Sequence, residues 1–275
     1  MTVVTTVSDS RASTRLTWSL LPAAGVSIAA FLLFGLRLAG IGHAVLAVAV
    51  LAAFARDREL GKDLSLIAVG VAIVSTTSVE ADLSWDRFVT IGVVLTLAVS
   101  VPFLIDRFVY RRRAIRFPWH SARRWPVLEK AYLVLVPVLG WLILPLYFIP
   151  SGAYLNWPDV SDGSELVRFF VGVNAVGTWD ELFFICTCFA LLRRHFPLWQ
   201  ANLLQATIFV SFLWELGYRE WGPLLTAPFA LLQGYIFTRT RSLTYVLIVH
   251  LLFDALVYLV IVHAHNREWL QIFFY

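Results

Sequence analysis

A series of long apolar segments, nearly free of charged residues, constrains this chain more than any other feature. About nine of these segments approach the roughly 20 residues that an α-helix needs to span a bilayer. They cover residues 16–36, 39–55, 64–79, 87–106, 131–149, 166–193, 199–217, 221–238 and 243–263. Hydrophobic residues make up 59% of the chain and charged residues 15%, whereas soluble domains have roughly 45–50% and 25%. The sequence therefore predicts a multi-pass membrane protein.

The same segments predict an all-α fold, because exposed strand edges cannot satisfy their backbone hydrogen bonds in lipid. We expect a transmembrane helical bundle with eight to nine spans. The segment at 166–193 is 28 residues long and would extend about 42 Å as a helix. Because this exceeds the thickness of the hydrocarbon layer, we expect the helix to be tilted, or to be broken near Gly177.

The distribution of basic residues predicts the orientation in the membrane. Most of the 22 Lys and Arg residues lie in alternate connecting segments, beginning with Arg11 and Arg15. Acidic residues such as Glu80, Asp82 and Asp159 collect on the opposite side. Because cytoplasmic loops are enriched in Lys and Arg, the amino terminus is predicted to be cytoplasmic and the carboxyl terminus outside. Runs of Ala, Val and Leu without eukaryotic targeting signals favour a bacterial inner membrane.

The densest basic stretch lies within residues 107–130 and is typical of a cytoplasmic loop that contacts anionic lipid headgroups. The net charge of +4 follows from this sorting of charges between the two sides, so no nucleic-acid partner is expected. The basic loop also divides the chain into an amino-terminal four-span region, residues 1–130, and a carboxy-terminal five-span region, residues 131–275.

Five ionisable residues lie within the predicted spans of the carboxy-terminal region: Asp180, Glu181, Glu215, His250 and Asp254. An acid at the centre of a bilayer costs about 2.5–3.5 kcal/mol on insertion scales, so these side chains should face one another or water. His250 and Asp254 are four residues apart and share one helix face. Asp180 and Glu181 are about 100° apart around a helix, so one can enter a shared site while the other turns to a partner beside that site.

Two explanations other than catalysis fit these residues. Buried acids and histidines join helices through hydrogen bonds worth about 0.6 kcal/mol each. A proton-coupled transporter also places acids and histidines at mid-membrane depth, but the sequence has no repeated halves or paired broken helices of the kind transporters use.

Two sequence motifs resemble those of the CPBP intramembrane proteases, the family that includes CAAX prenyl proteases and bacteriocin-processing or "abortive infection" proteins. The first is "WDELFF", with Asp180 and Glu181 at the Glu-Glu pair of the family motif Glu-Glu-x-x-x-Arg. The second is "LLQGYIFTRTRSLTYVLIVHLLFDAL", with His250 and Asp254 at the closing His-x-x-x-Asn/Asp. The resemblance covers about 100 residues, from 166 to 263.

The chain departs from the family pattern at three positions. Asp180 replaces a Glu, and Ile185 lies where the family has Arg. The family motif Phe-x-x-x-His has no His here, because Glu215 or Leu213 occupies that position, depending on the alignment. These departures keep open the alternative that the chain is a catalytically impaired family member that acts as a membrane scaffold.

The resemblance implies an intramembrane endopeptidase in which an activated water attacks a peptide bond of a membrane-embedded or lipidated substrate. Asp180 or Glu181 would be the general base, His250 would bind the water, and Asp254 would orient His250 or stabilise the oxyanion. Glu215 would act as an acid or a ligand. A divalent metal such as zinc would be held by Glu181, Glu215, His250 and Asp254, although the resemblance does not by itself imply a cofactor. The expected partners are membrane lipids and such a substrate.

Overall fold

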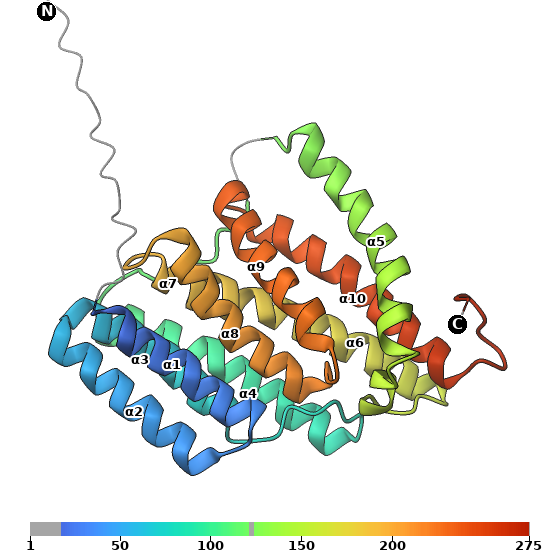
Figure 1. The fold of residues 1–275 in the computed structure, drawn as a ribbon, viewed down its shortest axis with the longest axis horizontal. Coiled ribbons are helices and arrows are strands. Elements are labelled where there is room, and N and C mark those ends of the chain that lie inside the picture. The colour runs from blue at the N-terminus through green and yellow to red at the C-terminus, as the bar shows by residue number, and fades with distance from the viewer. Residues whose placement is uncertain (1–17, 121–123, 275) are drawn as a thin grey trace, which may run out of the picture.

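The computed structural model describes residues 18–120 and 124–274, and this part of the chain is helical and contains no β-strand (Figure 1). The predicted all-α fold is confirmed. Arg11 and Arg15, on which the predicted cytoplasmic amino terminus depends, lie outside the described residues.

Within the described residues, each apolar segment found in the sequence corresponds to at least one helix. The helices are α1 (Leu20–Ala30) with η1 (Phe31–Gly35), α2 (Ala39–Arg56), α3 (Arg58–Val74), α4 (Trp85–Leu104) with η2 (Ile105–Val109), α5 (Val127–Phe148), η3 (Ala153–Asn156), α6 (Gly163–Asp180) with η4 (Glu181–Phe189) and α7 (Ala190–Leu192), α8 (Leu198–Leu216), α9 (Gly222–Thr240) and α10 (Leu243–His265).

Five helical stretches of the described chain are long and apolar enough to cross a membrane. They are Ala39–Arg56, Trp85–Val109, Val127–Phe148, Gly163–Leu192 and Leu243–His265. The chain is therefore a helical membrane protein, whereas the count of eight to nine spans stays a prediction.

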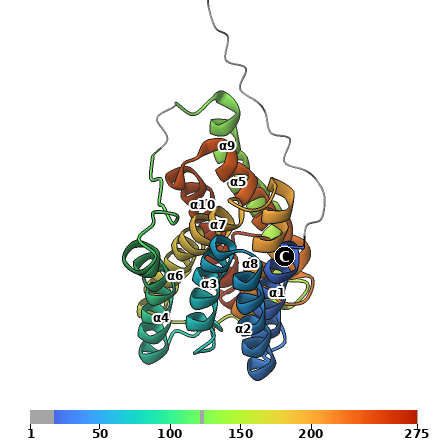
Figure 2. The ribbon, with the colours of Figure 1, turned by 90° about the vertical axis from the view of Figure 1, so that its left-hand side faces the viewer.

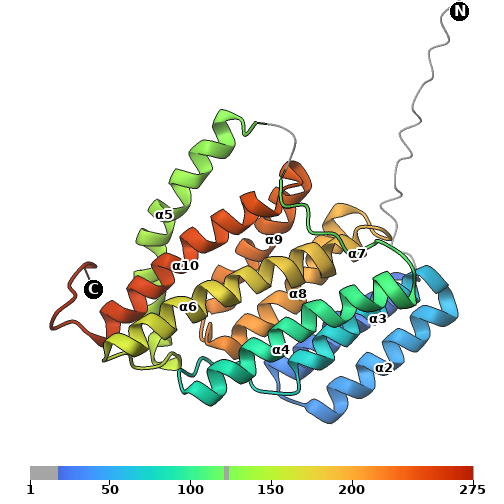
Figure 3. The ribbon, with the colours of Figure 1, turned by 180° about the vertical axis from the view of Figure 1, so that it is seen from behind.

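Helices α6, α8 and α10 occupy the middle of the molecule (Figures 1 and 3). Helices α1 to α4 lie on one side of them, and α5 lies on the other side, where it packs against α10. Figure 2, turned by 90°, shows α1, α2, α3 and α4 grouped at the same end of the bundle. The helices that carry the candidate residues are therefore the most enclosed ones.

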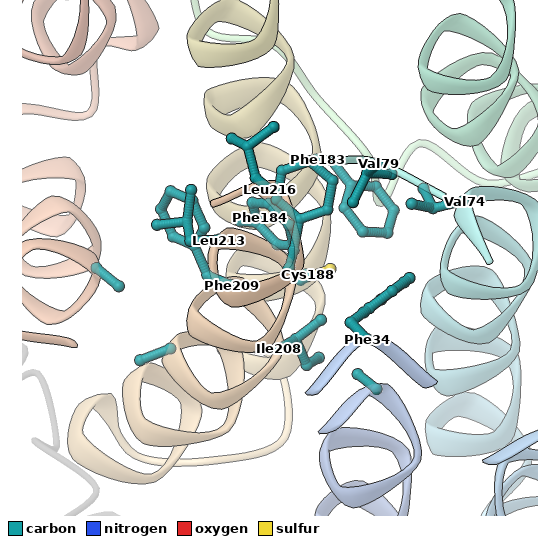
Figure 4. Close-up of a cluster of buried hydrophobic side chains, with 14 of the residues drawn as sticks. Phe34, Val74, Val79, Phe183, Phe184, Cys188, Ile208, Phe209, Leu213 and Leu216 are labelled. Carbon is teal, nitrogen blue, oxygen red and sulfur yellow. The ribbon is translucent and has the colours of Figure 1, made fainter. Parts of the chain in front are cut away.

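A cluster of aromatic side chains joins the amino-terminal helices to the central ones (Figure 4). Phe184 of η4 stacks on Phe209 of α8 with ring centroids 4.4 Å apart, and Phe34 of η1 meets Phe212 of α8 edge to face at 6.3 Å. Each of these four rings is at most 3% exposed. Aromatic pairs of this kind contribute about 0.5–1.5 kcal/mol each beyond their burial, so the cluster fixes η4 against both regions of the chain.

The helix connections alternate between two ends of the bundle. At one end, Asp63 pairs with Arg112 at 2.6 Å and with Arg194 at 2.9 Å. At the other end, Glu80 pairs with Arg37 at 2.6 Å and with Arg219 at 2.5 Å. This alternation matches the sorting of basic residues in the sequence, and the assignment of one end to the cytoplasm stays a prediction.

The long helical stretch Gly163–Leu192 is not broken at Gly177. Asp162 begins it with a capping box formed with Glu165, and α6 continues with α-helical geometry to Asp180. From Glu181 to Phe189 the hydrogen bonding becomes π-helical, as η4. A break near Gly177, one of the two expectations for this segment, is therefore wrong, and the change in geometry falls instead at the two acids.

Glu59 gives a pH-dependent test of the charged cluster around Asp63. Hydrogen bonds from Lys62 at 2.6 Å and Arg112 at 2.7 Å lower the pKa of Glu59 from 4.5 to about 2. A carboxylate with a lowered pKa stabilises the fold above its unfolded pKa, and that stability is lost as the pH falls through its folded pKa. We therefore expect Glu59→Gln to lower the free energy of unfolding at pH 7 by at most about 1 kcal/mol, because the side chain is half exposed and water screens the pairs.

Thermal unfolding in detergent from pH 7 downwards checks this expectation. The difference in the free energy of unfolding between wild type and Glu59→Gln should stay constant down to about pH 4.5 and become smaller toward pH 2. A difference that is the same at every pH would contradict the lowered pKa of Glu59.

Candidate active site

Three of the four acids and the histidine predicted from the sequence meet in the interior of the bundle. Asp180 is the last residue of α6 and Glu181 the first of η4, while His250 and Asp254 lie one turn apart on α10. Each of these four side chains is at most 5% exposed. Ionisable groups buried to this extent require partners, and here they provide them for one another.

The His250 ring lies between the carboxylates of the site. Its Nδ1 is 2.7 Å from Glu181 Oε1, a hydrogen bond, while its Nε2 is 3.7 Å from Asp180 Oδ2 and 3.7 Å from Asp254 Oδ1. Both neighbouring acids contact His250, because the ring inserts between them at the junction of α6 and η4, and each acid faces a different ring nitrogen.

Gly177 allows α10 to approach α6 at this point. A Cβ atom at Gly177 would overlap the Asp254 carboxylate and would lie 3.2 Å from Cδ2 of His250. The glycine that looked like a helix breaker in the sequence is therefore needed for its small size, since any larger side chain would displace two members of the site.

Gln233 of α9 belongs to the same cluster, although the sequence motifs did not predict it as a site residue. Its Nε2 donates to Glu181 Oε1 at 2.7 Å and to the carbonyl oxygen of Val246 at 3.2 Å, and the side chain is 1% exposed. A neutral amide carries no charge that would mark it within a span. An uncharged polar residue between apolar neighbours on a membrane helix was the available signal.

Glu215 does not join the cluster. It lies at the carboxyl end of α8, where its carboxylate is 3.9 Å from Arg37 and faces Ser78 and Val79 of the α3–α4 connection. The sequence placed Glu215 with the other acids because it lies within an apolar segment. In the fold, the last turn of α8 faces the α3–α4 connection, so Glu215 takes part in the charge pairing at that end.

The donor set does not fit the metal site considered from the sequence. Glu215 is not with Glu181, His250 and Asp254, and both nitrogens of His250 already face carboxylates. Within the described residues, no group of three or more His, Cys, Asp or Glu side chains is arranged to hold a metal ion. We therefore derive no chemical step through a metal.

A cavity of about 280 Å³ leads to the cluster. Asp180, His250 and Asp254 line it, whereas Glu181 does not. Most of its wall is apolar and comes from the α3–α4 connection, α4, α6, α8, α9 and α10, including Phe88, Ile91, Leu95, Phe169, Leu213 and Phe229. An apolar cavity with a few convergent polar groups is the usual form of a small-molecule or substrate site.

Three carboxylate oxygens of this cluster retain hydrogen-bonding capacity. Asp180 Oδ1, Glu181 Oε2 and Asp254 Oδ2 are buried and make no hydrogen bond within the described part of the chain, and Asp180 and Asp254 are the two of these acids that line the cavity. Buried acceptors without a donor are costly and occur at functional sites. The cavity end of the cluster can therefore accept protons or hydrogen bonds from a molecule that enters it.

A comparison with protein families finds one match in this region. Residues 162–256 match the model of the family described as type II CAAX prenyl endopeptidase, Rce1-like. The matched stretch begins at the cap of α6 and contains all four clustered residues and Gln233, which confirms the resemblance to CAAX proteases expected from the sequence motifs. No curated protein and no solved structure matches the chain.

Replacing Gly177 by alanine tests the close contact between α6 and α10. Because the new methyl group would collide with Asp254, Gly177→Ala should destabilise the protein by about 1–3 kcal/mol, the usual cost of overpacking. Gly172 on the same helix is the matched control, since a Cβ there would lie 3.5 Å from Phe88 in ordinary contact. Thermal unfolding in detergent should show Gly172→Ala to be neutral or stabilising. Equal effects of the two variants would contradict the contact.

Proposed function

We propose that this chain, whose residues 162–256 form an Rce1-like CAAX endopeptidase domain, is an intramembrane endopeptidase that hydrolyses peptide bonds of membrane-associated substrates. The observation that carries the proposal is the position of His250. Its Nε2 faces two carboxylates at 3.7 Å at the end of an apolar cavity. That arrangement supports activation of a water beside a substrate held by apolar contacts.

In the proposed mechanism Glu181 orients His250 and does not itself reach the substrate. The hydrogen bond between Glu181 Oε1 and His250 Nδ1 directs Nε2 toward the cavity. This is the geometry in which a carboxylate holds an imidazole ring in one orientation and stabilises its protonated form. Glu181 is absent from the cavity wall, which supports the orienting role.

Asp180 is the proposed general base. Its carboxylate accepts a proton from a water in the cavity while the water oxygen bonds to the carbonyl carbon of the substrate. His250, protonated on Nδ1 toward Glu181 and on Nε2 toward the cavity, donates a hydrogen bond from Nε2–H to the oxyanion that forms. The C–N bond then breaks as the proton on Asp180 passes to the leaving amine. Asp254, on the other side of Nε2, keeps the ring aligned.

The proposed substrate is a membrane-embedded or lipidated peptide or protein. None of the described residues that line the cavity is Lys or Arg, and the wall offers mainly apolar contacts. A substrate that already lies in the hydrocarbon layer has no contacts with water to give up when it binds to this apolar wall. Cleavage would take place in a bacterial inner membrane whose cytoplasmic side carries the amino terminus.

A non-catalytic binding role is the second candidate. Ile185, at the position of the family Arg, is fully buried, and Leu213 rather than a histidine lines the cavity from α8. The cavity therefore contains one imidazole where the family motifs supply two. A scaffold protein would use the same apolar cavity to hold a membrane partner without cleaving it.

Cleavage of a reporter by the purified protein separates these two candidates. We expect a juxtamembrane reporter in proteoliposomes to be cut by wild type. His250→Ala and Glu181→Gln should each lower the rate at least about 100-fold, because the first removes the donor to the oxyanion, whose loss typically costs 10²–10³-fold, and the second removes the carboxylate that orients this donor. Product formation measured by mass spectrometry gives the rates.

Glu215→Gln is the matched control, because it neutralises a buried acid outside the cluster and should leave the rate within about threefold of wild type. Melting temperatures verify that each variant is folded. Loss of activity in Glu215→Gln alone, or wild-type rates in both cluster variants, would reject this site. If wild type cuts no reporter, but a membrane partner co-purifies with wild type and all variants alike, the scaffold candidate is supported.

A further inference from the structure

Gln233 joins three helices at the base of the cluster. It lies on α9, and its side-chain amide donates to Glu181 on η4 and to the backbone of Val246 on α10. Val246 lies one turn before His250 on the same helix. One amide group therefore ties the carboxylate that holds His250 to the helix that carries His250.

The orientation of this amide is determined by its neighbours. Glu181 Oε1 and the Val246 carbonyl oxygen are both acceptors, so the group that faces them must be the NH₂ end of the side chain. Its two hydrogens serve the two acceptors, one each. A carboxylate at position 233 would place a third acceptor against them, and a leucine would supply no donor.

Glu181 Oε1 receives two hydrogen bonds, one from Gln233 Nε2 and one from His250 Nδ1, each 2.7 Å long. Because its position is held by the amide, the carboxylate cannot turn Oε1 away from the imidazole without losing a buried hydrogen bond. Leaving a buried polar group unpaired costs free energy. The rotamer of Glu181 is thus coupled to Gln233.

We infer that Gln233 is a positioning residue for the proposed hydrolysis: it holds Glu181 so that Nδ1 of His250 is engaged and Nε2 is the nitrogen presented to the cavity. This inference rests on the proposed function for its catalytic consequence, while the hydrogen-bond geometry is independent of it. Gln233 does not line the cavity, so it acts on the reacting groups only through Glu181 and His250.

The surroundings of His250 define which groups influence its titration. The charged groups that face the ring are Glu181 of η4, Asp180 of α6 and Asp254 of α10. The helices α8 and α9 present the rings of Phe209 and Phe229, with centroids 6.2 Å and 5.0 Å from that of His250. A change at Gln233 therefore reaches His250 through Glu181.

The test replaces Gln233 and observes His250 directly. In protein labelled with ¹⁵N-histidine, the His250 signals are identified by their loss in His250→Ala. In wild type we expect the Nδ1 resonance of a hydrogen-bonded N–H group. Gln233→Leu should shift the titration midpoint of His250 by about one pH unit, the effect of one hydrogen bond to a charged group. Gln233→Glu, which adds a carboxylate beside Glu181, should also shift it.

Gln205→Leu is the matched control. Gln205 is a fully buried glutamine of α8 whose Nε2 donates to the backbone of Ala230 on α9 at 2.9 Å and to Asn202 Oδ1, and it does not line the cavity. It therefore makes the same kind of interhelical bond without contacting Glu181. Its loss should lower the melting temperature about as much as Gln233→Leu, but should leave the His250 titration unchanged.

Reporter cleavage gives the second readout. Gln233→Leu should lower kcat about 10- to 100-fold, the range found when an outer hydrogen-bonding residue that positions a functional group is removed. KM should change little, because the apolar wall is untouched. The pH profile of kcat should move with the His250 titration, which a purely structural effect would not cause.

The two proposals fail separately. If wild type cuts no reporter but Gln233→Leu still moves the His250 titration relative to Gln205→Leu, the positioning role stands and the proposed hydrolysis fails. If wild type cuts the reporter, while Gln233→Leu matches Gln205→Leu in titration, kcat and pH profile, the inference about Gln233 is overturned. Should Gln233→Leu fail to fold, Gln233→Glu, which retains the side-chain volume, decides between these outcomes.

Discussion

The structure depends on one constraint: an imidazole and three carboxylates are buried together in a bundle whose surroundings offer them few other partners. Each acid alone would make its helix costly to bury in a membrane. Placed around His250, with one oxygen at 2.7 Å from Nδ1 and two at 3.7 Å from Nε2, the groups share hydrogen bonds and charge. The approach of α6, η4 and α10 follows from this requirement.

Close packing is what makes that shared site possible. Gly177 leaves room for Asp254. The π-helical geometry begins at Glu181, and the two adjacent acids face different nitrogens of the His250 ring. The aromatic cluster of Phe183, Phe184 and Phe209 holds η4 in place (Figure 4). A π-helical segment within an α-helix is often found at a functional site, and here it coincides with the catalytic candidates.

The cavity is built by both regions of the chain, although the family match is confined to residues 162–256. Phe88, Ile91 and Leu95 of α4 and Val79 of the α3–α4 connection lie outside the matched stretch and line the cavity together with α6. Glu80 and Arg219 join that connection to the end of α8. Helix α4 and the α3–α4 connection therefore shape the space in front of His250, so variation in α4 would alter which molecules fit without changing the polar cluster.

The sequence by itself determined that the chain is an all-helical membrane protein, because apolar length and the cost of exposed backbone groups are local properties. It also identified His250, Asp254, Asp180 and Glu181, since a charge in an apolar segment is visible one residue at a time. Only the tertiary structure decided that Glu215 lies elsewhere, that both neighbouring acids contact His250, that Gly177 serves packing, and that Gln233 completes the cluster. These four contacts depend on which faces of the helices pack together. Side chains that are far apart in the sequence determine that packing.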